Sequence, residues 1–123
     1  MENIIRSGRW VFILSFLTYV ALHVLKPDTG ADFVPDFLPF PLIWNYVTGL
    51  CVLAFIVSCL LRRYDKLATL LMALYVTLVT LLVHVPLAAT SENDALNIFR
   101  NIMVIGALLM YAGAYAQDKR IIG

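Results

Sequence analysis

The chain alternates between four long hydrophobic runs and short polar segments. The runs cover about residues 10–25, 42–61, 67–89 and 98–116. Each comes close to the roughly 20 apolar residues with which a helix crosses about 30 Å of hydrocarbon. The first run is the shortest, but Arg9 and Lys26 flank it, and their long side chains can extend its reach to the headgroups. The pattern predicts an all-α integral membrane protein with four spanning helices.

The polar segments indicate how these helices follow one another. The sequence RRYDK, residues 62–66, is a tight turn that makes the second and third helices antiparallel neighbours. Ser91 and Asp94 have the spacing of a helix-capping box, so the fourth helix should begin near Glu92. We therefore predict an up-down-up-down four-helix bundle that forms a single membrane domain over residues 1–123.

The segment between the first two runs, residues 26–41, holds four of the five prolines. Prolines should end the first helix and keep this loop extended or turned. Its aromatic residues Phe33, Phe37 and Phe40 are too apolar to extend into water. Two interpretations stay open and are compatible: the loop covers the outer mouth of the bundle, or it anchors the chain among lipid headgroups.

Composition and charge support a membrane protein and suggest its orientation. Hydrophobic residues make up 62% of the chain and charged residues 14%, where a soluble domain has about a quarter. The first and third loops carry only Lys26 and Arg100. The two ends of the chain and the second loop carry the other seven basic residues: Arg6, Arg9, Arg62, Arg63, Lys66, Lys119 and Arg120. This bias predicts a multi-pass protein of the cytoplasmic (inner) membrane with both termini cytoplasmic.

The charges also bear on partners. There is no basic stripe of the kind that binds nucleic acid, so nucleic acid is excluded as a partner. We expect membrane lipids as partners, together with other membrane proteins or a second copy of the chain.

The two cysteines, Cys51 and Cys59, both lie in the second run. Eight residues of helix separate their Cα atoms by about 12 Å, whereas a disulfide needs less than about 7 Å. The pattern therefore argues against thiol–disulfide exchange as the activity.

Polar residues within or beside the runs gather near one end of each helix. Because neighbouring helices run in opposite directions, six of them should reach one depth in the outer third of the membrane: His23, Asn45, His84, Asn97, Arg100 and Asn101. A rotation of 100° per residue gives the third helix one face formed by Thr69, Ala73, Thr77, Thr80 and His84. Polar groups are costly in lipid, so we expect an inward-facing polar pocket that opens to the outer side.

The residue types in this pocket limit the chemistry that it can perform. Two histidines on facing helices can ligate a b-type haem, but no flanking motif accompanies His23 and His84, so haem is not expected. A metal site needs three or four ligands, and no carboxylate lies inside the runs, so no metal is predicted. No organised nucleophile is present, because Ser15 and Ser58 lie at other depths, so no catalytic residue is predicted. The pocket fits a quinone, a lipid headgroup or a similar amphipathic molecule. The alternative is that the polar groups only bond to one another and hold the helices together.

The order of elements resembles the DoxX and DoxX-like family of small four-helix membrane proteins. The resemblance lies in the loop FVPDFLPFP, in the stretch WNYVTGLCVLAFIVSCLLRRYDKLATLLMALY, and in Arg100-Asn101 at the start of the fourth span. The family's second span often has a Gly followed shortly by Glu, whereas Leu50 and Cys51 follow Gly49 here. A role for that carboxylate is therefore not carried over.

The resemblance implies a small accessory subunit that works with quinol-oxidising or thiosulfate–quinone redox systems. We accordingly expect an accessory or binding subunit of a larger membrane complex, which is not an enzyme on its own. The alternatives are a small quinone-linked membrane oxidoreductase and a purely structural or chaperone-like membrane protein.

Overall fold

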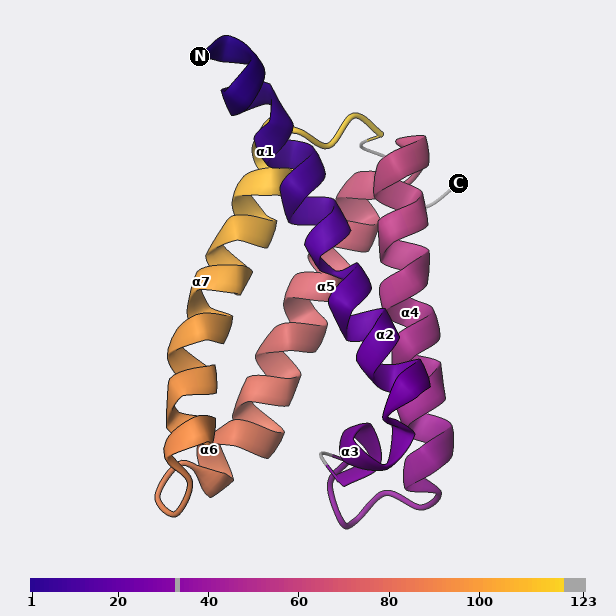
Figure 1. Ribbon diagram of the computed structural model, residues 1–123, viewed down its shortest axis with the longest axis vertical. Helices are drawn as coiled ribbons and strands as arrows, with labels where there is room; N and C mark the ends of the chain where they lie inside the picture. Colours follow the sequence, from indigo (N-terminus) through magenta and orange to yellow (C-terminus); the bar gives the residue numbers. More distant parts are fainter. Residues whose placement is uncertain (33, 119–123) are drawn as a thin grey trace. The chain divides into compact units, whose positions relative to one another are not determined.

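The computed structural model describes residues 1–32 and 34–118. All regular secondary structure in these residues is helical (Figure 1). In chain order the elements are α1 (Glu2–Ser15), α2 (Leu17–Leu25), α3 (Pro27–Asp32), α4 (Pro41–Leu61), α5 (Asp65–Val79), the π-helix η1 (Thr80–His84), α6 (Val85–Leu87) and α7 (Glu92–Ala114). The predicted all-α class is therefore confirmed for the described part of the chain.

Four helical stretches are long enough and apolar enough to cross a membrane: Glu2–Leu25, Pro41–Leu61, Asp65–Leu87 and Glu92–Ala114. They match the four predicted runs and indicate a multi-pass membrane protein. The start of the fourth stretch is also confirmed, because α7 begins at Glu92 and the Ser91 side chain accepts a hydrogen bond from the backbone N–H of Asp94.

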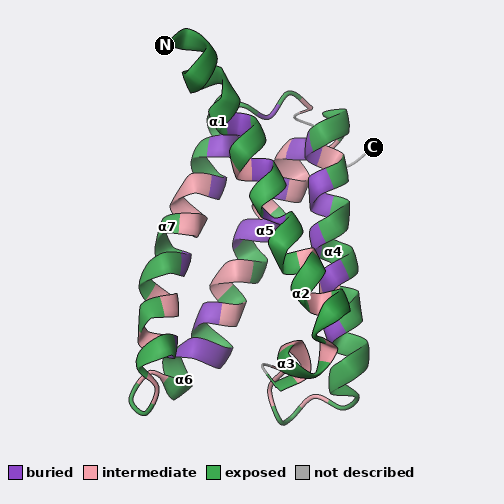
Figure 2. Ribbon diagram, viewed as in Figure 1, coloured by how far each residue is buried: buried purple, intermediate pink, exposed green. Residues whose placement is uncertain are grey.

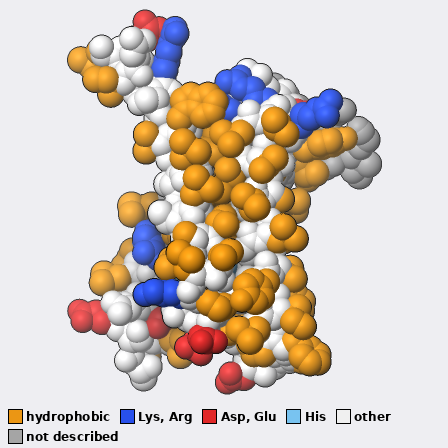
Figure 3. Space-filling view, turned by 45° about the vertical axis from the view of Figure 1, so that its right-hand side comes forward, with side chains coloured by type: hydrophobic (Ala, Val, Ile, Leu, Met, Phe, Trp, Pro, Cys, Tyr) orange, Lys and Arg blue, Asp and Glu red, His pale blue; other side chains and the backbone are white. Residues whose placement is uncertain are grey.

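The outward faces of the helices are strongly apolar. Met110 on α7 is 71% exposed, and Leu50 on α4 and Leu71 on α5 are also exposed. Figure 2 shows exposed residues along the sides of the helices, and hydrophobic side chains cover much of the face in Figure 3. Exposed apolar surface on this scale is unfavourable in water and suits contact with lipid.

The chain divides into two compact units, of which the first is Met1–Arg63. Within this unit α1 and α2 run one way, α3 lies at the turn, and α4 returns alongside them (Figure 1). The core between the helices is aromatic and aliphatic: the rings of Phe16 and Phe55 meet edge to face with centroids 5.0 Å apart, and Ile13 and Ile56 are buried. Packing of these side chains holds α4 against α1 and α2.

The Arg9 side chain does not extend toward the headgroups as predicted. It is buried, and its Nη2 donates a hydrogen bond of 2.7 Å to the carbonyl oxygen of Cys59. Cys59 lies in the last turn of α4, where carbonyl groups lack partners within the helix. Arg9 therefore caps the end of α4 rather than extending toward the headgroups.

The loop between the first two spans also differs from expectation, because residues 27–32 form the short helix α3. Pro27 occupies the first helical position, where its fixed φ suits a helix and its missing N–H is not needed. The prolines end the preceding helix as predicted, since α2 stops at Leu25.

The second unit begins at Tyr64. In it α5, η1 and α6 form one arm and α7 the other, and the arms pack along their length. Its buried core includes Met72, Ala73, Leu108 and Tyr111. The single domain predicted over residues 1–123 stays a prediction.

Candidate functional site

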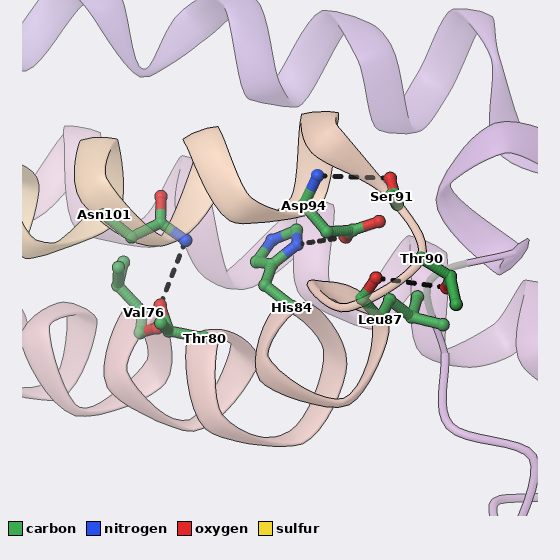
Figure 4. Close-up of polar contacts among 8 residues, drawn as sticks. All are labelled: Val76, Thr80, His84, Leu87, Thr90, Ser91, Asp94 and Asn101. Atoms are coloured by element: carbon green, nitrogen blue, oxygen red, sulfur yellow. Dashed lines mark hydrogen bonds and ion pairs between the residues drawn. The ribbon is translucent and has the colours of Figure 1, made fainter.

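The second unit holds a buried pair of ionisable side chains between its two helical arms. The Nδ1 atom of His84 lies 2.7 Å from Oδ1 of Asp94, and both residues are buried (Figure 4). An ionised carboxylate can only accept, so the imidazole donates through its Nδ1–H. The pair joins the end of η1 to the first turn of α7.

Local sequence explains why these two side chains meet. His84 ends the π-helix Thr80–His84, and Pro86 follows it at the start of α6. Proline cannot donate the backbone hydrogen bond that would continue an α-helix, and π-turns often occur at functional positions. On the other arm, Ser91 caps α7 and thereby fixes the backbone of Asp94 in the first turn.

A second polar contact joins the same two arms. Asn101 Nδ2 donates to Thr80 Oγ1 at 3.0 Å, and that hydroxyl donates to the carbonyl oxygen of Val76 at 2.7 Å (Figure 4). Both side chains are buried and both are hydrogen-bonded. This contact consists of neutral groups only, which distinguishes it from the His84–Asp94 pair.

The first unit holds its own polar cluster at the junction of α2, α3 and α4. His23 Nδ1 lies 2.6 Å from Asn45 Oδ1, and Asn45 Nδ2 donates to the carbonyl oxygen of His23 at 2.9 Å. The Asn45 side chain is only 1% exposed, whereas His23 is part-buried. Asn45 thus bonds to both the ring and the backbone of His23.

Two glycines allow this cluster to close. A Cβ on Gly30 of α3 would lie 1.8 Å from Asn45 Oδ1 and 3.2 Å from His23 Nδ1. A Cβ on Gly49 of α4 would lie 3.0 Å from the Cβ of His23. Both positions need glycine because a neighbouring side chain approaches the backbone closely.

The predicted site residues are divided between the two units. His23 and Asn45 bond to each other in the first unit, while His84 and Asn101 lie on the polar contacts of the second. Asn97 is partly buried, and Arg100 is exposed on α7.

The predicted covering loop is only partly described. Phe37 and Phe40 are 74% and 69% exposed, as a headgroup anchor would be. Phe33, and the basic residues Lys119 and Arg120 used for the orientation, lie outside the described residues.

Sequence reasoning missed Asp94 as the partner of His84. The sequence pattern identifies Asp94 only as a capping residue, and no carboxylate is expected near the pocket. Its position in the first turn of α7, directly across a short loop from His84, was the available signal.

A metal site would need three or four ligating side chains close together. Within residues 1–32 and 34–118, no group of three or more His, Cys, Asp or Glu side chains is placed to hold a metal ion. Comparison of the chain with models of known protein families, with curated proteins and with solved structures gives no match.

Proposed function

We propose that this chain is a DoxX-like accessory or binding subunit of the cytoplasmic membrane that holds a quinone, a lipid or a similar amphipathic ligand. In this proposal the four spans form an up-down-up-down bundle with both termini in the cytoplasm, and the subunit works in a larger respiratory or redox complex. The bias of basic residues supports the orientation, and the quoted sequence motifs support the family.

The observation that carries the ligand proposal is the His84–Asp94 pair. Both groups are ionisable and both are buried. His84 lies within the third hydrophobic run, where an ionisable group is costly and generally belongs to a functional site, and Asp94 pairs with it from the first turn of α7. Neutral groups could join the two arms without ionisable partners, as Asn101 and Thr80 do. Helix packing alone therefore does not require a histidine and a carboxylate.

The chemistry of the pair suits the polar head of an amphipathic molecule. Its tail would lie among the lipid-facing side chains, and its head would reach the imidazole and the amides near the beginning of α7. Arg100, which is exposed on the same helix, would supply a further hydrogen-bond donor from its guanidinium.

Two alternatives remain. If the bound molecule is a quinone and it turns over in the isolated chain, the protein is a small quinone-linked oxidoreductase. If no molecule is held, the polar contacts serve only to join helices, and the protein is structural or chaperone-like.

Purification in native lipid, followed by mass spectrometry of the extracted small molecules, tests the proposal. We expect one quinone or lipid species to be enriched over the surrounding membrane, and Arg100→Ala to lose it while the fold survives. Arg63→Ala, an exposed arginine of the first unit, is the matched control and should retain the species. An extracted profile that is the same in Arg100→Ala and in the parent would contradict the proposed role of Arg100.

The proposed orientation has a separate test. Reporter domains that are active only in the cytoplasm should work when fused to either end of the chain. Activity at one end alone would contradict an even number of crossings.

A further inference from the structure

We propose that one end of the first unit binds acidic phospholipid headgroups. This is the end at which α1 begins and α4 finishes, and the proposal does not depend on a ligand at His84. We name this surface the basic end, and it consists of six residues: Ile4, Ile5, Arg6, Trp10, Arg62 and Arg63.

A hydrogen bond brings the two parts of the basic end together. Arg9 Nη2 lies 2.7 Å from the carbonyl oxygen of Cys59, so α1 packs there against the last turn of α4. Arg6 precedes Arg9 by three residues, which is about one helical turn. Arg62 and Arg63 follow Cys59 by three and four residues. Arg6 therefore lies at the same end of the unit as Arg62 and Arg63.

These three arginines are accessible to an external group, because all of them are exposed. Arg6 pairs with Glu2 at 2.6 Å, but the two side chains are 74% and 76% exposed, and exposed ion pairs contribute little to stability. Arg6 can therefore exchange the carboxylate of Glu2 for a phosphate at small cost.

Charge separates the two ends of the first unit. At the basic end, three exposed arginines less Glu2 leave a net charge of +2. At the other end, in and beside α3, one lysine and three aspartates are exposed and leave a net charge of −2: Lys26, Asp28, Asp32 and Asp36. An acidic partner is therefore attracted to one end of the unit and repelled from the other.

The apolar side chains of the basic end indicate what kind of acidic partner fits. Ile4 and Ile5 are exposed, Ile4 at 76%, although both precede the first hydrophobic run. The helical stretch Glu2–Leu25 has 24 residues and is about 36 Å long, against about 30 Å of hydrocarbon, so it extends into the headgroups. Trp10 is exposed as well, and tryptophan is enriched at headgroup depth.

Isoleucines and arginines together at this depth are typical of a helix that inserts apolar side chains among acidic lipids. An acidic phospholipid offers both the negative charge and the apolar chains. Each arginine near a membrane surface favours an acidic lipid by about fivefold. Because the basic end is exposed, lipids bound there exchange with the surrounding bilayer, which distinguishes it from a site that retains a co-purifying ligand.

The chain carries a reporter at each end of the first unit, because its two tryptophans are Trp10 and Trp44 and both are exposed. Trp10 lies beside the arginines, with the Arg9 guanidinium 4.5 Å from the centre of its ring. Trp44 lies in the first turn of α4, next to Asn45, which bonds to His23 at the other end of the unit. Trp44→Phe and Trp10→Phe therefore give full-length forms that each report the lipids at one end.

The test places each form in vesicles that contain phosphatidylglycerol and phosphatidylcholine, with one of the two lipids brominated in its acyl chains. Bromine quenches tryptophan on contact, so the quenching gives the relative affinity of the two lipids. We expect Trp10 to report phosphatidylglycerol bound about fivefold more tightly, which corresponds to one arginine at the headgroup. Trp44 should report no preference for it. In about 1 M salt, screening within about 3 Å should remove the preference at Trp10.

The triple variant Arg6→Gln, Arg62→Gln and Arg63→Gln should bring the two affinities at Trp10 close to equality. Lys26→Gln removes a positive charge at the other end and, as the matched control, should leave the preference unchanged. Equal quenching by the two lipids at Trp10, as expected if the partner is an acidic protein, would overturn the proposal, and so would an equal preference at Trp44. A preference that persists in the triple variant or in high salt would overturn it too. The comparison of the two reporters does not depend on the charge variant folding.

Discussion

The Asp65 carboxylate and the backbone of Asp118 are joined by a hydrogen bond of 2.8 Å, and Asp118 in turn accepts one of 2.8 Å from the backbone N–H of Tyr64. Asp65 also accepts from the backbone N–H groups of Lys66 and Gln117. Its side chain is completely buried at the start of α5. These contacts join the segment after α7 to the beginning of α5 and close the second unit at that end.

Asp65→Ala should therefore be strongly destabilising. It would leave the backbone N–H groups of Lys66, Gln117 and Asp118 without their acceptor. These groups are only part-buried and water can replace part of the lost bonding, so the loss should be about 1–3 kcal/mol in all. The measurement is thermal unfolding of the purified protein in detergent. Asp36→Ala, an exposed change in the loop, is the control and should unfold like the parent. A melting temperature for Asp65→Ala close to that of the parent would show that these contacts do not stabilise the unit.

Arg9→Ala should destabilise the first unit. The change removes the donor to the Cys59 carbonyl, and hydrogen bonds to charged groups contribute about 1.5–3 kcal/mol. Arg6 provides a matched control in the same helix, because its contact with Glu2 is an exposed ion pair of the kind that contributes little. The free energy of unfolding should fall for Arg9→Ala and stay near the parent value for Arg6→Ala. Equal effects of the two changes would contradict the capping role of Arg9.

Gly30→Ala tests the close packing of α3. The new Cβ would fall 1.8 Å from Asn45 Oδ1, so α3 or the amide must move, and overpacking of this kind typically costs about 1–3 kcal/mol. A Cβ added at Gly8 in α1 would meet no other atom within 4 Å, so Gly8→Ala should stabilise its helix by about 0.5–1 kcal/mol. Opposite shifts in melting temperature are expected for the two variants. A shift of the same sign in both would argue against the tight contact.

Arg62→Gly should stabilise the chain despite removing a charge. Arg62 ends α4 in the left-handed conformation with φ of 54°, which costs a residue with a side chain about 1–2 kcal/mol and costs glycine little. Arg63, the next residue, is not among those with positive φ, so Arg63→Gly should only add flexibility and destabilise slightly. Comparison of the two melting temperatures checks this. A lower melting temperature for Arg62→Gly than for Arg63→Gly would contradict it.

The sequence predicts the helices and their buried faces well because hydrophobicity repeats with the helical period. The four spans, the start of α7 at Glu92 and the buried positions of Thr69, Ala73 and Thr80 all follow from local patterns of this kind. Contacts between side chains that are far apart in the sequence leave no repeating pattern of this kind, so they cannot be predicted in the same way.

The contacts that the sequence did not predict join side chains to partners in other segments of the chain. Arg9 directly precedes the first hydrophobic run, and Asp65 and Asp94 lie in the first turns of α5 and α7. A charge at such a position ordinarily faces headgroups or water. Each is buried instead, because a backbone or side-chain partner from another segment satisfies it. The helix α3 was missed for a related reason, since a proline at the first helical position gives the same sequence signal as a proline in a turn.

The most direct test of the ligand proposal is the molar ratio of extracted ligand to protein in three preparations: the parent, His84→Asn and Thr80→Val. His84→Asn keeps a donor for Asp94 and removes the rest of the imidazole, whereas Thr80→Val removes the other contact between the same two arms. We predict a ratio near one ligand per chain in the parent and in Thr80→Val, and loss of most of the ligand in His84→Asn at a melting temperature close to that of the parent. A ratio that does not change in His84→Asn, or no enriched ligand in the parent, would contradict a binding role for the His84–Asp94 pair.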